Sequence, residues 1–296
     1  MARVLVVGAG AVGCYFGVQL QRGGHEVTFL ARPAQVEAFP ADGLRFESGG
    51  TTEQIQISAT ADPSAARDAD FILLVVKSYD TAAAARELAP HLGDATAVVC
   101  LQNGVTNHEL FQHETGHAAI PAVVYVAAQM QSATHLLHNA AGHLAIGAGH
   151  DDVQHLFKSA GIPCRISESI ESDLWEKLII NCAFNGISAL TDANYGAMMN
   201  SPLTRQLMEQ IVAEGTAVAQ TLGLRLELEA VKRATWKVGE TMQTAISSTA
   251  QDLQRGKRTE IEFLNGHIFE AAQKLGQTAP ANRAIYALIK LLETTR

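Results

Sequence analysis

Residues 4–13 read VLVVGAGAVG, an apolar run that passes directly into the glycine pattern G-x-G-x-x-G. A continuous β-branched run is typical of a buried parallel strand, and a helical pattern follows the glycines. At such a junction Gly8 can form the tight turn, Gly10 lets the backbone approach a pyrophosphate, and Gly13 lets the helix lie close to the strand. The alternative is an ordinary Gly-rich turn. The pattern predicts a dinucleotide site contacted by Gly8, Ala9, Gly10, Ala11, Val12 and Gly13.

The end of the second predicted strand, residues 27–30, indicates which dinucleotide binds. NAD sites usually place Asp or Glu about 20 residues past the glycines, where the carboxylate accepts a hydrogen bond from the ribose 2′-hydroxyl. Here that strand ends in Ala31-Arg32-Pro33. A guanidinium accepts no hydrogen bond but can clamp a phosphate. Arg32 therefore predicts NADP(H), with a solvated surface arginine as the alternative interpretation.

Two types of pattern divide the chain. Apolar runs alternate with helical segments in the first half, where we predict strands at 3–7, 27–30, 71–76 and 97–101 and helices at 12–22 and 81–88. A hairpin, 44–47 with 55–58, and strands at 119–126 and 143–147 complete the expected sheet. From Ser169 onward apolar residues recur at helical spacing. The sequence predicts an α/β protein, with a Rossmann-type doubly wound sheet in residues 1–167 and an all-helical catalytic and substrate domain in residues 168–296.

Composition excludes several classes of partner. The 296 residues are 47% hydrophobic and 18% charged, and the net charge is −8. Nucleic acids and membrane surfaces do not attract an acidic protein, so we expect neither as a partner. The four cysteines are widely spaced without a C-x-x-C pair, which argues against a disulfide framework and a zinc site. With the first strand beginning at Arg3 and no spanning segment, we expect a cytoplasmic protein without a metal.

Polar residues follow two predicted strands at the edge where ligands bind in doubly wound folds. Residues 71–76 end in Lys77, and residues 97–101 end in Gln102-Asn103-Gly104. Lys77 could contact the cofactor or a substrate anion, although a solvated strand end is also compatible. Asn103 could bind the cofactor ribose or the substrate, whereas Asn-Gly is also a strong turn signal.

A polar stripe crosses an otherwise apolar segment of the second half. Lys177, Asn181 and Asn185 stand at positions i, i+4 and i+8 of the run WEKLIINCAFN, so they share one helix face. A lysine in apolar surroundings costs several kcal/mol unless a carboxylate or a ligand accompanies it. The stripe predicts a substrate cleft, with a structural lysine paired to a core acid as the alternative.

Glu260 is the candidate acid for Lys177, and Ser248 lies twelve residues before it. The segment Thr259-Glu260-Ile261-Glu262 matches a capping box, with Thr259 as the N-cap and Glu262 as its partner. Glu260 would then occupy the first turn of a helix, where an ionised carboxylate is favoured. First-turn glutamates are common for stability alone, so the spacing does not by itself connect Glu260 with Lys177.

These motifs together resemble the ketopantoate reductase (2-dehydropantoate 2-reductase) family. The resemblance covers nearly the whole chain in order, and the motifs of the second half are absent from Rossmann enzymes in general. It rests on the glycine pattern, Arg32, Lys77, the runs QNG at 102–104 and EKL at 176–178, Asn181, Ser247-Ser248, residues 259–262 and Asn265-Gly266.

The resemblance implies reduction of 2-dehydropantoate to (R)-pantoate by NADPH, on the pathway to pantothenate and coenzyme A. It implies that Lys177 is the general acid and that Glu260 holds the lysine together with the cofactor or a substrate hydroxyl. Asn181, Asn185 and Ser248 would bind substrate, and Asn103 would contact both substrate and cofactor. The cofactor would also be contacted by Arg32, Lys77 and Ala127, the last through its backbone.

One position departs from the family pattern. The next substrate asparagine of the family lies in the loop after the lysine helix, where Asp192-Ala193-Asn194 offers Asn194 only after a shift of one residue. This departure leaves open a reductase for a different 2-oxo acid. A non-catalytic NADP sensor is a further alternative, although a sensor needs no proton donor. A homodimer is compatible with the amphipathic helix predicted at 207–222.

Overall fold

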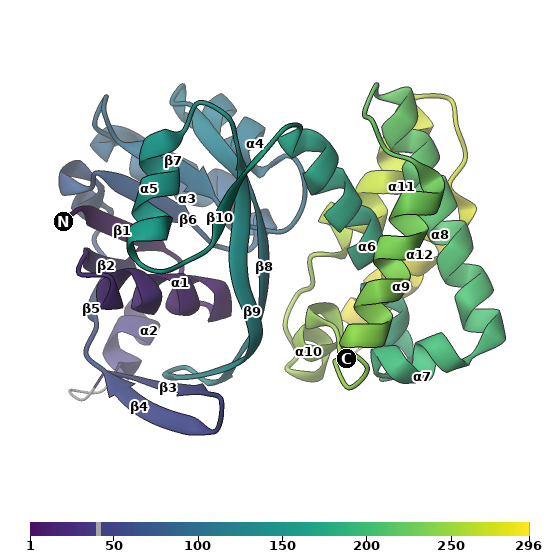
Figure 1. The fold of residues 1–296 in the computed structure, drawn as a ribbon, viewed down its shortest axis with the longest axis horizontal. Coiled ribbons are helices and arrows are strands. Elements are labelled where there is room, and N and C mark those ends of the chain that lie inside the picture. The colour runs from purple at the N-terminus through teal and green to yellow at the C-terminus, as the bar shows by residue number, and fades with distance from the viewer. Residues whose placement is uncertain (40–42, 296) are drawn as a thin grey trace. The chain divides into compact units, whose positions relative to one another are not determined.

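The computed structural model describes residues 1–39 and 43–295. Contacts within the chain separate unit 1, Met1–Ile170, from unit 2, Glu171–Arg296 (Figure 1). The predicted cofactor domain, 1–167, and the predicted substrate domain, 168–296, remain proposals about function. Helix α6 (Ile170–Thr191) begins where unit 1 ends.

Unit 1 is built on a ten-stranded sheet in the order β4-β3-β9-β8-β7-β6-β1-β2-β5, with β10 paired to β9. Neighbouring strands in the stretch β8-β7-β6-β1-β2-β5 are all parallel, whereas β8 and β9 form a long antiparallel hairpin. The strands are β1 (Arg3–Val7), β2 (Glu26–Leu30), β3 (Leu44–Ser48), β4 (Thr51–Ile55), β5 (Ser58–Thr60), β6 (Phe71–Leu74), β7 (Ala97–Cys100), β8 (Ala119–Ser132), β9 (His135–Gly147) and β10 (Cys164–Ser167).

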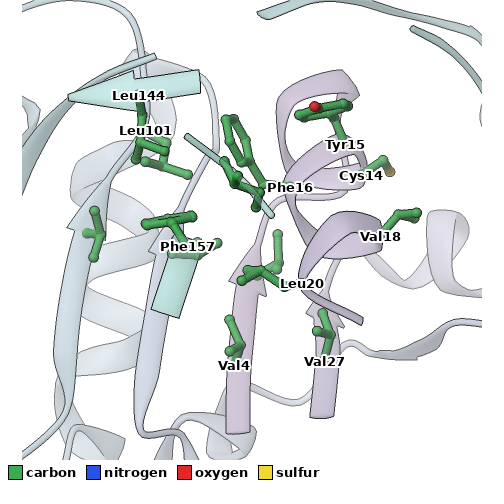
Figure 2. Close-up of a cluster of buried hydrophobic side chains, with 14 of the residues drawn as sticks. Val4, Cys14, Tyr15, Phe16, Val18, Leu20, Val27, Leu101, Leu144 and Phe157 are labelled. Atoms are coloured by element: carbon green, nitrogen blue, oxygen red, sulfur yellow. The ribbon is translucent and has the colours of Figure 1, made fainter. Parts of the chain in front are cut away.

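Helices cover both faces of this sheet, which confirms the doubly wound prediction. Alternate residues of β1 point to opposite faces, so Val4 and Val6 join one buried cluster while Leu5 and Val7 join another. Helices α1 (Ala11–Arg22) and α5 (Asp151–Ser159) contribute Phe16, Leu20 and Phe157 to the first cluster (Figure 2). The second cluster takes side chains from α3 (Thr81–Leu88) and α4 (Asn107–Thr115). Shorter elements are α2 (Pro33–Ala38), η1 (Pro63–Asp68), η2 (Ser78–Asp80) and η3 (Ala89–His91).

The predicted hairpin forms, but its second strand was placed wrongly. Strand β4 covers Thr51–Ile55 instead of residues 55–58. Gly49 and Gly50 both have positive φ, 57° and 78°, and this two-residue turn pairs Ser48 directly with Thr51. The strand therefore begins immediately after the glycines, in an exposed polar stretch whose alternation is weak. Residues 58–60 instead form β5, which pairs in parallel with β2.

The described part of unit 2 contains helices and no strand, as the apolar spacing predicted. After α6 the chain forms α7 (Tyr195–Asn200), α8 (Pro202–Thr221), α9 (Leu228–Thr241), α10 (Ser248–Gln254), η4 (Ile261–Phe263), α11 (Asn265–Lys274) and α12 (Pro280–Thr295). None of the helices in residues 1–39 and 43–295 is long and apolar enough to cross a membrane.

The capping box predicted at Thr259 is wrong. Residues 261–263 form a single 3-10 turn, and the helix starts only at Asn265. The carboxylate of Glu262 does not return to the backbone, because it pairs with Arg258 and with Lys290 on α12. Glu260 consequently precedes the 3-10 turn and does not sit in the first turn of an α-helix.

The glycine pattern has three distinct structural environments. Gly8 has a φ of 112°, and a Cβ there would lie 2.9 Å from the backbone nitrogen of Val76, just past β6. A Cβ on Gly13 would overlap the carbonyl oxygen of Gly8, because α1 lies directly on the turn. A Cβ on Gly10 would meet no atom within 4 Å. Gly8 and Gly13 are thus required by the fold, whereas folding places no steric demand on Gly10.

We expect Gly13→Ala to destabilise unit 1 by about 3 kcal/mol, because backbone oxygen cannot move aside as a flexible side chain can. Gly10→Ala is the matched control, and its free energy of unfolding should lie within a few tenths of a kcal/mol of the wild-type value. Thermal denaturation followed by circular dichroism measures both. Equal stabilities for Gly13→Ala and Gly10→Ala would show that the close approach of α1 is not a constraint.

Candidate active site

In unit 1, the ends of β1, β2 and β6 meet at the glycine turn. The Gly8 nitrogen donates to the Leu30 carbonyl at the end of β2, and a Cβ on Gly8 would meet the backbone of Val75 and Val76, which leads directly into Lys77. Lys77 is partly buried with extended backbone, and its carbonyl accepts a hydrogen bond from the Asp80 nitrogen at 2.8 Å. The carboxyl ends of parallel strands form the ligand edge of such sheets, so this is where a dinucleotide would lie.

Asn103, after β7, is held by its backbone rather than by its side chain. The Asn103 carbonyl accepts hydrogen bonds from Ser78 Oγ at 2.9 Å and from Asn107 Nδ2 at 2.7 Å. Thr81 Oγ1 in turn donates to Asn107 Oδ1 at 2.9 Å. Ser78, Asn107 and Thr81 are buried, and none was singled out from the sequence. This network fixes the loop while the Asn103 amide makes no hydrogen bond within the described residues.

Arg32 follows β2 and lies at the surface, with its side chain 81% exposed. Its Nη2 contacts a carboxylate oxygen of Asp80 at 2.9 Å. Beside it, Gln35 Nε2 donates to the Ala9 carbonyl at 2.5 Å, which ties the start of α2 to the glycine turn. Arg32 is therefore near the glycine turn. It is paired with Asp80, which the sequence did not predict.

Ala127 lies on β8 at an irregular part of the pairing with β9. The register shifts between Ala127 and Ala128 and again between Tyr125 and Val126. Such bulges leave backbone groups outside the regular ladder and are frequent beside active sites. This geometry is compatible with a backbone contact from Ala127.

In unit 2, α6 carries Lys177, Asn181 and Asn185 on one face, as the spacing predicted. The Lys177 ammonium is desolvated by its surroundings, which lowers its pKa to about 8, and the negative charge of Glu260 opposes that shift. The structure thus brings Lys177 and Glu260 into electrostatic contact. Glu260 is itself buried, with 7% of its surface exposed.

Two amides on the Lys177 face have no hydrogen-bond partner. Asn185 is only 3% exposed, yet neither its side-chain oxygen nor its nitrogen is hydrogen-bonded within residues 1–39 and 43–295. The partly buried Asn181 amide is likewise without a partner there. Buried amides are normally hydrogen-bonded, so the buried Asn185 amide, on the same helix face as the partly buried Asn181 and Lys177, is a candidate ligand-binding group.

The segment carrying Glu260 is anchored to α12. Glu293 accepts hydrogen bonds from the Thr259 nitrogen at 2.8 Å and from the Thr259 hydroxyl at 2.7 Å. Asn265 Nδ2, five residues beyond Glu260, donates to the Cys182 carbonyl on α6 at 3.2 Å and to Asn282 Oδ1 at 2.9 Å. These bonds set the position of Glu260 relative to α6.

The adjacent serines Ser247 and Ser248 have different roles. Ser247 is buried; its Oγ caps α10 through the Ala250 nitrogen at 3.1 Å and donates to the Asn185 carbonyl at 3.0 Å. Ser248 is exposed and its hydroxyl has no partner among the described residues. Ser247 thus joins α10 to α6, which leaves Ser248 as the hydroxyl available to a ligand.

Asn194 is used by the fold. Its Oδ1 accepts the Ala197 nitrogen at 2.8 Å and caps α7, as the Asn side chain commonly does at this position. The residue is exposed. The two N–H donors and the second lone pair of Oδ1 remain for other partners.

Nothing in residues 1–39 and 43–295 gathers three or more His, Cys, Asp or Glu side chains at a distance suited to a metal ion. The candidate groups are instead an ammonium, a carboxylate and amides in unit 2, with a glycine turn and an arginine in unit 1. An ammonium of depressed pKa beside unpaired amides can give a proton to an oxygen that becomes negative.

Comparisons with known proteins agree along the whole chain. The ketopantoate reductase PanE/ApbA family model matches residues 4–151, and the model of its C-terminal part matches residues 169–293. The 2-dehydropantoate 2-reductase of Archaeoglobus fulgidus is 31% identical and aligns with 99% of this chain and 98% of its own. That of Halobacterium salinarum is 32% identical over 98% and 99% of the two chains.

Solved structures show the same relationship. A PanE/ApbA family ketopantoate reductase from Ralstonia eutropha JMP134 is 42% identical with a TM-score of 0.93, over 99% of both chains. A D-mandelate dehydrogenase bound to NADH and anilino(oxo)acetate also has a TM-score of 0.93, at 21% identity, and shares the fold. With family models matching both units and relatives above 30% identity along nearly its full length, this chain belongs to the ketopantoate reductase family of NADP(H)-dependent oxidoreductases.

Proposed function

We propose that this protein reduces 2-dehydropantoate to (R)-pantoate with NADPH, and so serves the pathway to pantothenate and coenzyme A. The observation that carries the proposal is the α6 face, where a partly buried lysine of lowered pKa interacts with the charge of Glu260 and shares its helix face with two asparagines. The relatives named 2-dehydropantoate 2-reductase support this substrate.

The residues of unit 1 fit a dinucleotide. Gly10 has open space where a Cβ would project, and it is the N-cap of α1, whose first N–H groups lack helical partners. We propose that the backbone from Gly8 to Gly13 holds the pyrophosphate and that Arg32 holds the 2′-phosphate. Lys77, Asn103 and the backbone of Ala127 complete the proposed contacts. When bound, the nicotinamide supplies the hydride.

The proposed chemistry of this chain is a proton transfer at the ketone oxygen. Negative charge grows on that oxygen as the carbonyl carbon is reduced, and the Lys177 ammonium stabilises it and then donates its proton. Glu260 keeps the lysine charged against the effect of burial. Asn181, Asn185 and the Ser248 hydroxyl would bind the substrate, and the lysine also attracts its carboxylate.

A second candidate is reduction of another 2-oxo acid. It is favoured by Asn194, which is offset by one residue from the family's loop asparagine and whose side-chain oxygen already caps α7. NADPH oxidation over a panel of 2-oxo acids tests both candidates. The highest kcat/KM on 2-dehydropantoate would support the first, a better substrate would support the second, and no turnover at all would favour a sensor.

We expect Lys177→Ala to lower kcat about a thousandfold, since a positioned general acid contributes roughly a hundred- to ten-thousandfold. Lys237→Ala is the control, because Lys237 is an exposed lysine of the same unit on α9. Steady-state kinetics at saturating NADPH compares the two variants. Turnover by Lys177→Ala at the wild-type rate would remove Lys177 as the acid.

The pH dependence of kcat follows from the sign of the Lys177 shift. Reduction needs the protonated amine, and burial lowers its pKa to about 8, so kcat should fall tenfold per pH unit above about pH 8. Glu260→Gln removes the charge that raises this pKa and should move the decline to lower pH. Profiles of kcat from pH 6 to 10 measure both. If kcat of Glu260→Gln declined at the same pH as wild type or at a higher pH, the proposed pairing of Glu260 with Lys177 would be wrong.

Arg32→Ala should weaken NADPH binding at least tenfold more than NADH binding, because only NADPH carries the 2′-phosphate that the guanidinium would clamp. Dissociation constants from quenching of protein fluorescence measure the difference. Arg22→Ala, which removes an arginine paired with Glu53 elsewhere in unit 1, controls for loss of positive charge. Equal losses for both cofactors in Arg32→Ala would refute the clamp.

A further inference from the structure

We propose that Asp80 is a specificity-determining residue for the cofactor. Its carboxylate competes with the 2′-phosphate of NADPH for Arg32 and can accept a hydrogen bond from the 2′-hydroxyl of NADH. Both effects reduce the ratio of NADPH affinity to NADH affinity. The proposal rests on the function proposed above, in which Arg32 lies at the adenosine end of the cofactor.

The geometry places an acid where the sequence around Arg32 shows none. Asp80 is 48 residues further along the chain, yet its carboxylate lies 2.9 Å from the Arg32 guanidinium. It reaches that position because β6 and β2 both flank β1, so the loops after β6 and β2 end at the same edge of the sheet. An NAD site uses an acid after the second strand, and here the loop after β6 provides one.

Among the residues that the structure describes, the Asp80 carboxylate contacts Arg32 and makes no further hydrogen bond or ion pair. Asp80 immediately precedes α3, but its side chain makes no capping hydrogen bond to that helix. Its backbone nitrogen donates to the Lys77 carbonyl, which fixes the residue in the loop whatever its side chain is. Its side chain is 35% exposed, so a cofactor could reach it.

The charges determine the direction of the effect. A 2′-phosphate carries nearly two negative charges and would share Arg32 with an existing carboxylate, and like charges in close contact oppose binding. A 2′-hydroxyl carries no charge and can donate a hydrogen bond to that carboxylate. Removing the charge at Asp80 should therefore strengthen binding of one cofactor and weaken binding of the other.

Fragments of the cofactor isolate this end of the site. Isothermal titration calorimetry of the full chain with 2′,5′-ADP and with 5′-AMP gives affinities that do not depend on turnover. We expect Asp80→Asn to tighten 2′,5′-ADP about thirtyfold, the effect of one carboxylate charge roughly 4 Å from a phosphate of nearly two charges in a well-solvated site. Binding of 5′-AMP should weaken, and Kd values for NADPH and NADH should change in the same two directions.

Two further variants make the result specific. Asp68→Asn removes an equally negative charge that is 85% exposed, before β6 at the opposite end of the strand, and should leave the ratio of the two affinities unchanged. Asp80→Glu keeps the charge and should stay close to wild type. Circular dichroism confirms that each variant is folded.

Affinities for 2′,5′-ADP and 5′-AMP that move together, or not at all, in Asp80→Asn would overturn the role of Asp80. Arg32→Ala separates this failure from a failure of the proposed function. If Arg32→Ala lowers 2′,5′-ADP affinity selectively while Asp80→Asn has no effect, only the inference on Asp80 is wrong. If Arg32→Ala is not selective either, the phosphate clamp itself is wrong, and the Asp80 inference is overturned with it.

Discussion

The electrostatic contact between the partly buried Lys177 ammonium and the Glu260 carboxylate is the interaction around which the candidate site in the second half of the chain is built. Burial alone favours a neutral Lys177, and the structure lowers its pKa accordingly. The carboxylate of Glu260 opposes that tendency, but it does so only because it is brought to α6 from a segment more than eighty residues away. The bonds of Thr259 to Glu293 and of Asn265 to Cys182 secure this approach. Polar contacts to α12 and α6 on either side of Glu260 therefore support this electrostatic contact.

The parts of the fold that follow local rules were predictable from the sequence. The strand, glycine turn and helix at residues 3–22 and the amphipathic stripe of α6 are set by short-range periodicity and by turn chemistry. Predictions were wrong where a weak sequence pattern was outweighed by tertiary contacts or by turn geometry. At Thr259 the apparent capping partner, Glu262, is taken by Arg258 and Lys290, a choice that only tertiary contacts decide. In the hairpin, the glycine turn determined the register against a weak alternation in residues 55–58.

The candidate site was predictable in its types of residue and less so in their partners. Spacing placed Lys177, Asn181 and Asn185 on one face, but it gave no reason to connect Arg32 with Asp80 or Asn103 with Ser78. Those contacts join loops after different strands, and their positions depend on strand order. One usable signal existed: Ser78 and Asp80 follow Lys77 in the same strand-end loop. Ser247 and Ser248 could not be told apart from the sequence, because they are adjacent and identical. They differ only in the structure, where the Ser247 hydroxyl is hydrogen-bonded within the fold and the Ser248 hydroxyl is exposed.

The contrast between the glycine turn and the Arg32–Asp80 pair bears on how this enzyme can evolve. A side chain at Gly13 would meet the Gly8 carbonyl oxygen and the side chains of Val75 and Val6, so almost any substitution there destabilises the fold. Arg32 and Asp80 lie on the surface, outside both buried clusters. Under the roles proposed for these two residues, single substitutions at the surface would change which pyridine nucleotide the enzyme prefers without disturbing the buried clusters.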